Sequence, residues 1–309
     1  MANKSSPGRP SIAGQSHLEV AVLLCSSFSI LSALAAPIPT RRHLARAPSG
    51  GWPQSNADNF GVTGGFNQRF LKTIEGQPTL VGNYPKGSYA GSKATKENQS
   101  PPGIAGFIFS ASGGPDVDIE SAKEVKLTYQ VKFPADFEWA LGGKMPGLYG
   151  GNNAERAGQC SGGHHSDECW SARLMWRDNG KGELYAYLPT ANQKLPVCKG
   201  KCDVKYGASI GTGKWTYAPG QWTTITERVK LNDVGEMNGE IEILINGQSQ
   251  VKVDGLQLRG DSSGRIRGIM MHTFFGGSSS PNFQSPKNQE AYFRDFALEV
   301  TEKLNGKAR

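Results

Sequence analysis

Apolar and polar residues alternate along many short segments of this chain, as expected for β-strands with one buried and one solvated face. The clearest examples are residues 125–133 and 225–231. Gly, Pro, Asn and Asp clusters separate the other strand candidates, which are 79–81, 106–110, 138–141, 171–177, 183–189, 222–231, 239–245, 248–253, 265–275 and 290–300. Asn246-Gly247 separates two of them as a two-residue hairpin turn. Long helical periodicity is absent, so the pattern predicts an all-β sandwich or barrel.

Residues 171–189 form the most informative segment, which reads as two strands joined by the turn 178–182. Side chains two residues apart on a strand share a face, so each strand separates its residues into an apolar and a polar set. The apolar set suits a core. The polar set carries a hydroxyl, two guanidinium groups, a carboxylate and two phenols: Ser171, Arg173, Arg177, Glu183, Tyr185 and Tyr187. We expect this combination to have a chemical use.

The length of 309 residues fits one large β-domain, and the chain shows no internal repeat or linker between domains. We expect a single folded domain over residues 57–303, preceded by a loose tail or pro-segment at 36–56. The adjacent Arg41 and Arg42 offer a possible processing point within that tail.

Residues 1–35 resemble a secretory signal peptide, because two basic residues precede an apolar stretch at 20–34 and a small-x-small cleavage site ends at Ala35. An N-terminal membrane anchor is the alternative, but the apolar run is short for spanning a bilayer. We therefore expect a secreted, extracellular protein. The formal charge is +7, and loss of residues 1–35 removes two basic residues and one acidic residue, which leaves +6. This balance favours an acidic polysaccharide as the partner. We expect a monomer that binds neither nucleic acid nor a membrane.

Four cysteines remain after loss of the signal, and three pairings are possible. Local closure in an oxidising compartment favours disulfides between Cys160 and Cys169 and between Cys198 and Cys202. The spacing Cys160-x3-His-His-x3-Cys169 could also be drawn as a zinc site. Secretion favours the disulfide, and we expect no metal or other cofactor.

Lys144 lies in a glycine-rich segment, 142–151, which we expect to be a loop beside the polar hairpin face. Lys144 and Arg173 could neutralise the carboxylate of a uronic acid, which makes the neighbouring C5 proton more acidic. Tyr185 and Tyr187 could then supply the base and the acid of a β-elimination, since nearby cations lower a phenol's pKa. This chemistry requires no metal. A carboxylate pair for glycoside hydrolysis, Glu183 with Asp295 or Glu299, is a weaker alternative because nothing brings two of them together.

Several blocks of residues resemble polysaccharide lyase family 14, whose members include alginate and glucuronan lyases with a β-jelly-roll fold. The blocks span 143–151, 160–163, 171–177 and 183–189, and further similar segments lie at 84–89, 273–277 and 291–296. Together they cover about residues 60–300 in the family's order.

The resemblance implies a jelly-roll sandwich of two antiparallel sheets in a single domain. It also implies that Lys144, Arg173, Tyr185 and Tyr187 act in catalysis, and that Ser171 contacts substrate. We include His165 and Arg177 among the expected substrate-binding residues. The departure from the family pattern at Ala172 falls on the apolar face, so we expect no effect on activity.

The sequence thus predicts a lyase that cleaves β-1,4-linked polyuronate by β-elimination. We rank glucuronan first as the substrate and alginate, especially its mannuronate blocks, second. The alternative is a non-catalytic jelly roll that binds acidic polysaccharide through the same basic face.

Overall fold

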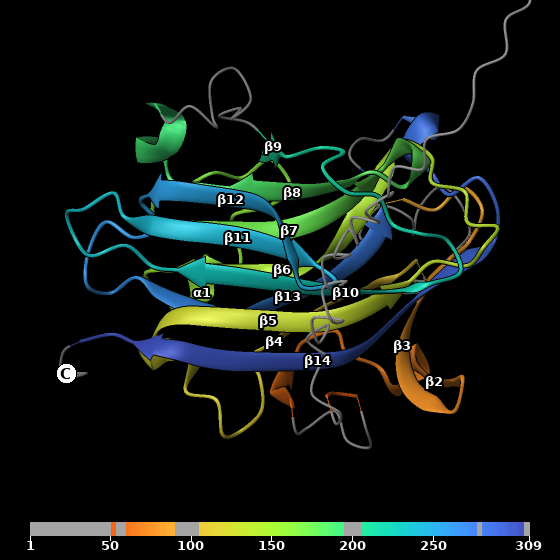
Figure 1. The fold of residues 1–309 in the computed structure, drawn as a ribbon, viewed down its shortest axis with the longest axis horizontal. Helices are drawn as coiled ribbons and strands as arrows, with labels where there is room; N and C mark the ends of the chain where they lie inside the picture. Colours follow the sequence, from red (N-terminus) through yellow and green to blue (C-terminus); the bar gives the residue numbers. More distant parts are fainter. Residues whose placement is uncertain (1–50, 54–59, 90–104, 195–205, 277–279, 306–309) are drawn as a thin grey trace, which may run out of the picture. The chain divides into compact units, whose positions relative to one another are not determined.

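Two antiparallel β-sheets pack face to face and make a jelly-roll sandwich, which confirms the predicted fold class (Figure 1). The structure is a computed structural model that describes residues 51–53, 60–89, 105–194, 206–276 and 280–305. Within these residues each sheet has seven strands. The site-bearing sheet has the order β1-β4-β13-β6-β7-β8-β9, and the second sheet has the order β12-β11-β10-β5-β14-β3-β2.

The strands of the site-bearing sheet are β1 (Val62–Thr63), β4 (Phe107–Ala111), β6 (Gly142–Gly151), β7 (Cys169–Arg177), β8 (Gly182–Tyr187), β9 (Ala208–Ile210) and β13 (Arg265–Phe275). Those of the second sheet are β2 (Leu71–Ile74), β3 (Gln77–Tyr84), β5 (Ala122–Lys132), β10 (Trp222–Lys230), β11 (Gly239–Ile245), β12 (Gln248–Leu256) and β14 (Gln289–Lys303). A single-turn helix, α1 (Ala154–Ala157), follows β6.

The core lies between the sheets and is built from alternate residues of their strands. In β5, Val125, Leu127, Tyr129 and Val131 are fully buried, while the residues between them are half-buried. The apolar sets of β7 and β8 join the same core. Period-2 alternation in the sequence therefore identified the inner faces correctly.

Strand β6 corrects the expectation of a loop around Lys144. Its glycines face bulky neighbours. A Cβ added to Gly143 would lie 2.1 Å from the Trp176 ring, and a Cβ added to Gly150 would lie 2.6 Å from the Trp170 ring. Both indoles are fully buried, so the glycines create the space that those rings fill.

The expected strand at 138–141 is wrong, since the chain turns there with Ala140 at a positive φ of 48°. The strand begins immediately afterwards, at Gly142.

Other strand predictions hold closely. β13 and β11 coincide with the predicted ranges 265–275 and 239–245. Asn246 and Gly247 both have positive φ, 51° and 81°, as a type I′ hairpin turn requires. The short strands β1, β2 and β9 were not predicted.

Two buried polar groups of the second sheet reach across the core to β6. The Tyr129 hydroxyl donates to the Pro146 carbonyl oxygen at 3.1 Å. The backbone N–H of Leu148 donates to Glu227 Oε2 at 3.0 Å, and Glu227 is fully buried. These contacts flank Gly147, and the β6–β7 register shifts by a bulge between Met145 and Gly147. The second sheet thereby holds the irregular part of the strand that carries Lys144.

Trp52 lies in the segment expected to be a tail, and its indole packs between Phe60 and Phe296 of the core. Its backbone also exchanges hydrogen bonds with Phe296. The predicted signal peptide, the Arg41-Arg42 point and the Cys198–Cys202 disulfide lie outside the described residues and remain predictions.

Across the described ranges, no helix is long and apolar enough to cross a membrane.

Candidate active site

The polar residues of β7 and β8 lie together on the outer face of the site-bearing sheet, the face turned away from the second sheet. The register of the two strands places Ser171 opposite Tyr187 and Arg173 opposite Tyr185. Lys144 comes from the next strand, β6, and pairs with Met175 of β7. Three neighbouring strands therefore bring together the four side chains expected to be catalytic.

Lys144 is the cation nearest to Tyr185. Its Nζ lies 3.5 Å from the centroid of the Tyr185 ring and 2.8 Å from Met175 Sδ. Only 7% of Lys144 is exposed. Burial, followed by the charges of Arg173 and Arg177, lowers the pKa of Lys144 well below its ordinary value, although Glu183 acts in the opposite direction.

Arg173 presents an unsatisfied guanidinium group. The residue is 2% exposed, and its NH1 donates to Nδ1 of His272 on β13 at 3.3 Å. Its Nε and NH2 atoms are buried and have no hydrogen-bond partner among the described residues. A buried guanidinium with free donors is costly, and a bidentate carboxylate is the ligand that matches its geometry.

The two phenols are perpendicular neighbours, with ring centroids 5.7 Å apart. Each phenol oxygen accepts a backbone N–H, from Gly163 to Tyr187 at 2.9 Å and from Gly207 to Tyr185 at 3.2 Å. Burial, followed by the proximity of Tyr187, raises the pKa of Tyr185 above its ordinary value, while the Gly207 amide and Arg173 oppose this shift. Tyr185 is therefore protonated at neutral pH.

A disulfide-closed loop covers Tyr187. Cys160 and Cys169 are bonded, with Cα atoms 5.7 Å apart, which confirms one predicted pairing and removes these thiolates as zinc ligands. The disulfide packs against Tyr187, and the His165 ring lies 4.7 Å from the ring of that tyrosine. His165 is also fixed by a hydrogen bond from Nε2 to the Tyr206 carbonyl oxygen at 2.9 Å.

Ser171 supports this loop. Its hydroxyl is fully buried and donates to the Cys160 carbonyl oxygen at 2.7 Å. In this conformation the hydroxyl holds the loop and does not face solvent.

Arg177 is neutralised within the protein. Glu183, which is 1% exposed, accepts from Arg177 Nε at 3.0 Å and from Arg177 NH2 at 2.6 Å. The hydroxyls of Ser209 and Thr212 donate to the same carboxylate at 2.9 and 2.6 Å. Because Glu183 is committed to Arg177, the described part of this site has two cations without a carboxylate hydrogen-bonded to them, Lys144 and Arg173.

The carboxylate pair considered for glycoside hydrolysis is not assembled. Glu183 lies on β8, whereas Asp295 and Glu299 lie on β14 of the other sheet. Among the residues described, the outer face therefore offers cations and phenols around an ion-paired carboxylate, and that is not the arrangement of a hydrolase.

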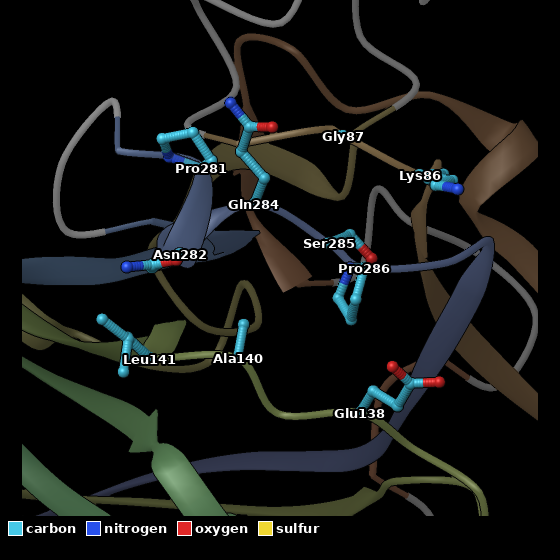
Figure 2. A pocket seen from close by; sticks show the side chains of 10 residues that line it. All are labelled: Lys86, Gly87, Glu138, Ala140, Leu141, Pro281, Asn282, Gln284, Ser285 and Pro286. Carbon is cyan, nitrogen blue, oxygen red and sulfur yellow. The ribbon is translucent and has the colours of Figure 1, made fainter.

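A pocket of about 610 Å³ lies apart from these side chains. Figure 2 shows Lys86 at its edge and the side chains that form its walls, which are Glu138, Ala140 and Leu141 on one side and Pro281, Asn282, Gln284, Ser285 and Pro286 on the other. None of the expected catalytic residues lines it. The candidate site is therefore the outer face of β6, β7 and β8.

Sequence reasoning missed His272 and the role of Met175. The alternation along β13 does place His272 on the outer face, between buried core residues Met271 and Thr273. Its contact with Arg173 crosses an intervening strand, so no local pattern indicated it.

The family assignment rests on residues 72–296, which match the family model described as Polysaccharide lyase 14. The chain belongs to polysaccharide lyase family 14. The curated protein exolysin of Paramecium bursaria Chlorella virus 1 is 26% identical over an alignment of 188 residues, which covers 56% of this chain and 29% of that relative. The lyase-family chain thus spans less than a third of the length of this curated relative.

Two solved structures resemble this member of polysaccharide lyase family 14 in both sequence and fold. One is the marine PL-14 alginate lyase from Aplysia kurodai, with 31% identity and a TM-score of 0.66 over 77% of this chain and 90% of that chain. The other is the alginate lyase vAL-1 from Chlorella virus, with 27% identity and a TM-score of 0.62 over 78% of this chain and 93% of that chain.

Proposed function

We propose that this protein is a secreted polysaccharide lyase that cleaves β-1,4-linked polyuronate by metal-independent β-elimination. The observation that carries the proposal is the buried Arg173 guanidinium, whose Nε and NH2 lack partners in the described structure and lie beside two phenols. A uronate carboxylate would satisfy these donors, and family membership supports the same chemistry.

Alginate replaces glucuronan as our first candidate substrate. The two solved relatives above are named alginate lyases, and this supports alginate by similarity. Both polymers carry the C5 carboxylate that the chemistry needs, so the reaction class is the same for either.

In the proposed mechanism, Arg173 and the Lys144 ammonium bind the carboxylate and stabilise the negative charge that develops when C5 loses its proton. Tyr187 takes that proton and does so as a phenolate, whose oxygen accepts the Gly163 N–H and whose ring lies beside the Arg173 guanidinium. The C5 electron pair forms a C4–C5 double bond as the C4–O4 bond breaks. Tyr185 donates its proton to O4, consistent with its raised pKa.

The remaining residues position this group. Ser171 and His165 hold the disulfide loop against Tyr187, and Glu183 fixes Arg177 at the edge of the site. After the reaction Tyr187 holds the proton from C5, and Tyr185 has lost its proton to O4. A single proton transfer from Tyr187 to Tyr185 therefore restores the enzyme. The product carries an unsaturated sugar at its new non-reducing end.

The test is incubation of the purified protein with mannuronate-rich alginate, guluronate-rich alginate, glucuronan and a neutral β-1,4-glucan. We expect ultraviolet absorbance from unsaturated ends on at least one polyuronate and none on the neutral glucan, with product masses confirming the unsaturated sugar. Binding to a polyuronate with no change in chain length would instead support the non-catalytic module. Saturated product ends would indicate a hydrolase.

A pair of tyrosine variants separates catalysis from binding. Tyr187→Phe should abolish turnover while preserving affinity for the polymer, because it removes the oxygen that accepts the C5 proton in the transition state. Tyr292→Phe, on β14 of the other sheet, serves as the matched control and should behave like the wild type. Secretion is tested separately by N-terminal sequencing of protein recovered from the medium, which should begin after residue 35.

A further inference from the structure

His272 reaches the candidate site from two strands away. It lies on β13, whereas its partner Arg173 lies on β7, and β6 runs between them. Strands two positions apart are separated by about 9–10 Å, so their side chains meet only where the strand between them leaves room. On β6, Gly147 pairs with Arg173 of β7 and with Met270 of β13, and the β6–β13 register shifts between Met270 and Phe274, the stretch that contains His272. The side chains of His272 and Arg173 meet across β6 where the β6–β13 register is irregular.

The contact defines the tautomer of His272. A guanidinium group has only donors, so Nδ1 of His272 must carry a lone pair and the ring proton must sit on Nε2. The charged groups that face the ring are Arg173 of β7 and Lys144 of β6, while Ile108, its partner on β4, is apolar. Burial, reinforced by these two cations, lowers the pKa of His272 to about 3. The ring is therefore a neutral acceptor across the range in which the protein would work.

We propose that His272 is a positioning residue that holds NH1 of Arg173 through Nδ1, so that the Nε–NH2 edge of the guanidinium is presented to the substrate carboxylate. The inference rests on the proposed function, because it assigns to Arg173 the task of binding that carboxylate. A neutral acceptor suits this task, since a carboxylate in the same place would neutralise Arg173 and compete with the substrate for it. The division of donors is then fixed, with NH1 committed to the protein and Nε and NH2 left for the ligand.

Three substitutions test which ring atom matters. His272→Asn places an amide oxygen near the position of Nδ1, His272→Gln places its amide near Nε2, and His272→Leu removes the acceptor. Loss of a hydrogen bond to a charged group predicts that kcat/KM on the best polyuronate falls about tenfold to a hundredfold in His272→Leu and His272→Gln. His272→Asn should stay within a few-fold of the wild type. Met270→Leu, two residues away on β13, is the control, and thermal unfolding of each variant checks the fold.

A substrate-independent measurement accompanies the kinetics. Nitrogen NMR of the wild-type imidazole should show a protonated Nε2 and an unprotonated Nδ1 for His272, with no titration between pH 5 and pH 8. Three results would overturn the proposal. They are a wild-type kcat/KM in His272→Leu, equal kcat/KM values in His272→Gln and His272→Asn, and a His272 ring that titrates between pH 5 and pH 8. If the wild type cleaves no polyuronate while the NMR result holds, the proposed function fails and the His272–Arg173 contact stands.

Discussion

Glu183→Gln gives the sharpest test of how the site is held together. The Glu183 carboxylate is buried and accepts four hydrogen bonds, two from Arg177 and one each from Ser209 and Thr212. The substitution keeps the shape of the side chain but removes its charge, which leaves the Arg177 guanidinium without a counter-ion. Breaking a buried pair costs about 3–5 kcal/mol. Arg177 is 18% exposed and the glutamine oxygen still accepts hydrogen bonds, so we expect a loss of about 2–3 kcal/mol in the free energy of unfolding.

Thermal and urea unfolding followed by circular dichroism measure this loss, which corresponds to a fall of about 5–10 °C in Tm for a domain of this size. Glu290→Gln is the control, because Glu290 forms an exposed pair with Lys72 and its substitution should change stability by less than about 0.5 kcal/mol. Arg177→Met combined with Glu183→Gln should recover part of the loss, since neither charge is then left alone. A Glu183→Gln protein as stable as the control variant, or additive effects in the double variant, would refute this account of the pair.

Three further predictions address the chemistry and its pH dependence. Tyr185→Phe should lower kcat about 10²- to 10⁴-fold with little change in polymer affinity. Steady-state kinetics and a binding assay measure these quantities, and an unchanged kcat would contradict the role of Tyr185 as the acid. The proposed role of Lys144 requires its charged form, so kcat/KM should fall as pH rises through the lowered pKa of this residue. Lys144→Arg should move this fall in kcat/KM to higher pH. A rise in kcat/KM through the same pH range would instead indicate that the neutral amine of Lys144 acts as a base. Burial raises the pKa of Glu227 well above its unfolded value, so its contribution to stability is present at low pH and is lost as pH rises through the folded-state pKa. Glu227→Gln cannot ionise, so its stability relative to the wild type should increase with pH in unfolding experiments from pH 4 to 8, and a constant difference would contradict the buried carboxylic acid.

The parts of the fold that the sequence revealed are those governed by local alternation. β5, β7, β8 and β10 each separate inner from outer residues at every step, and the outer residues of the 171–189 hairpin do meet in the structure. The pairing of Cys160 with Cys169 followed from short-range closure.

The rest depended on contacts between distant segments. β6 resembled a loop because its glycines are frequent in turns, and only the indoles of Trp170 and Trp176 explain them. The His272–Arg173 contact spans 99 residues and crosses a strand, so it depends on sheet order and register. Likewise, the outer-face charge of Arg177 is visible in the sequence, whereas its neutralisation by Glu183 depends on packing with Ser209 and Thr212.

The opposite faces of β7 and β8 impose a constraint on how this family can diversify. Neighbouring residues on these strands face opposite sides of the sheet, since one packs in the interior and the next lies on the outer face that carries the candidate site. Insertion or deletion of a single residue within either strand would exchange the two sets, so that indoles would enter solvent and guanidinium groups would enter the core. New substrate preferences can therefore arise by point replacement on the outer face, or by changes in the connecting loops, while the lengths of these two strands stay constant.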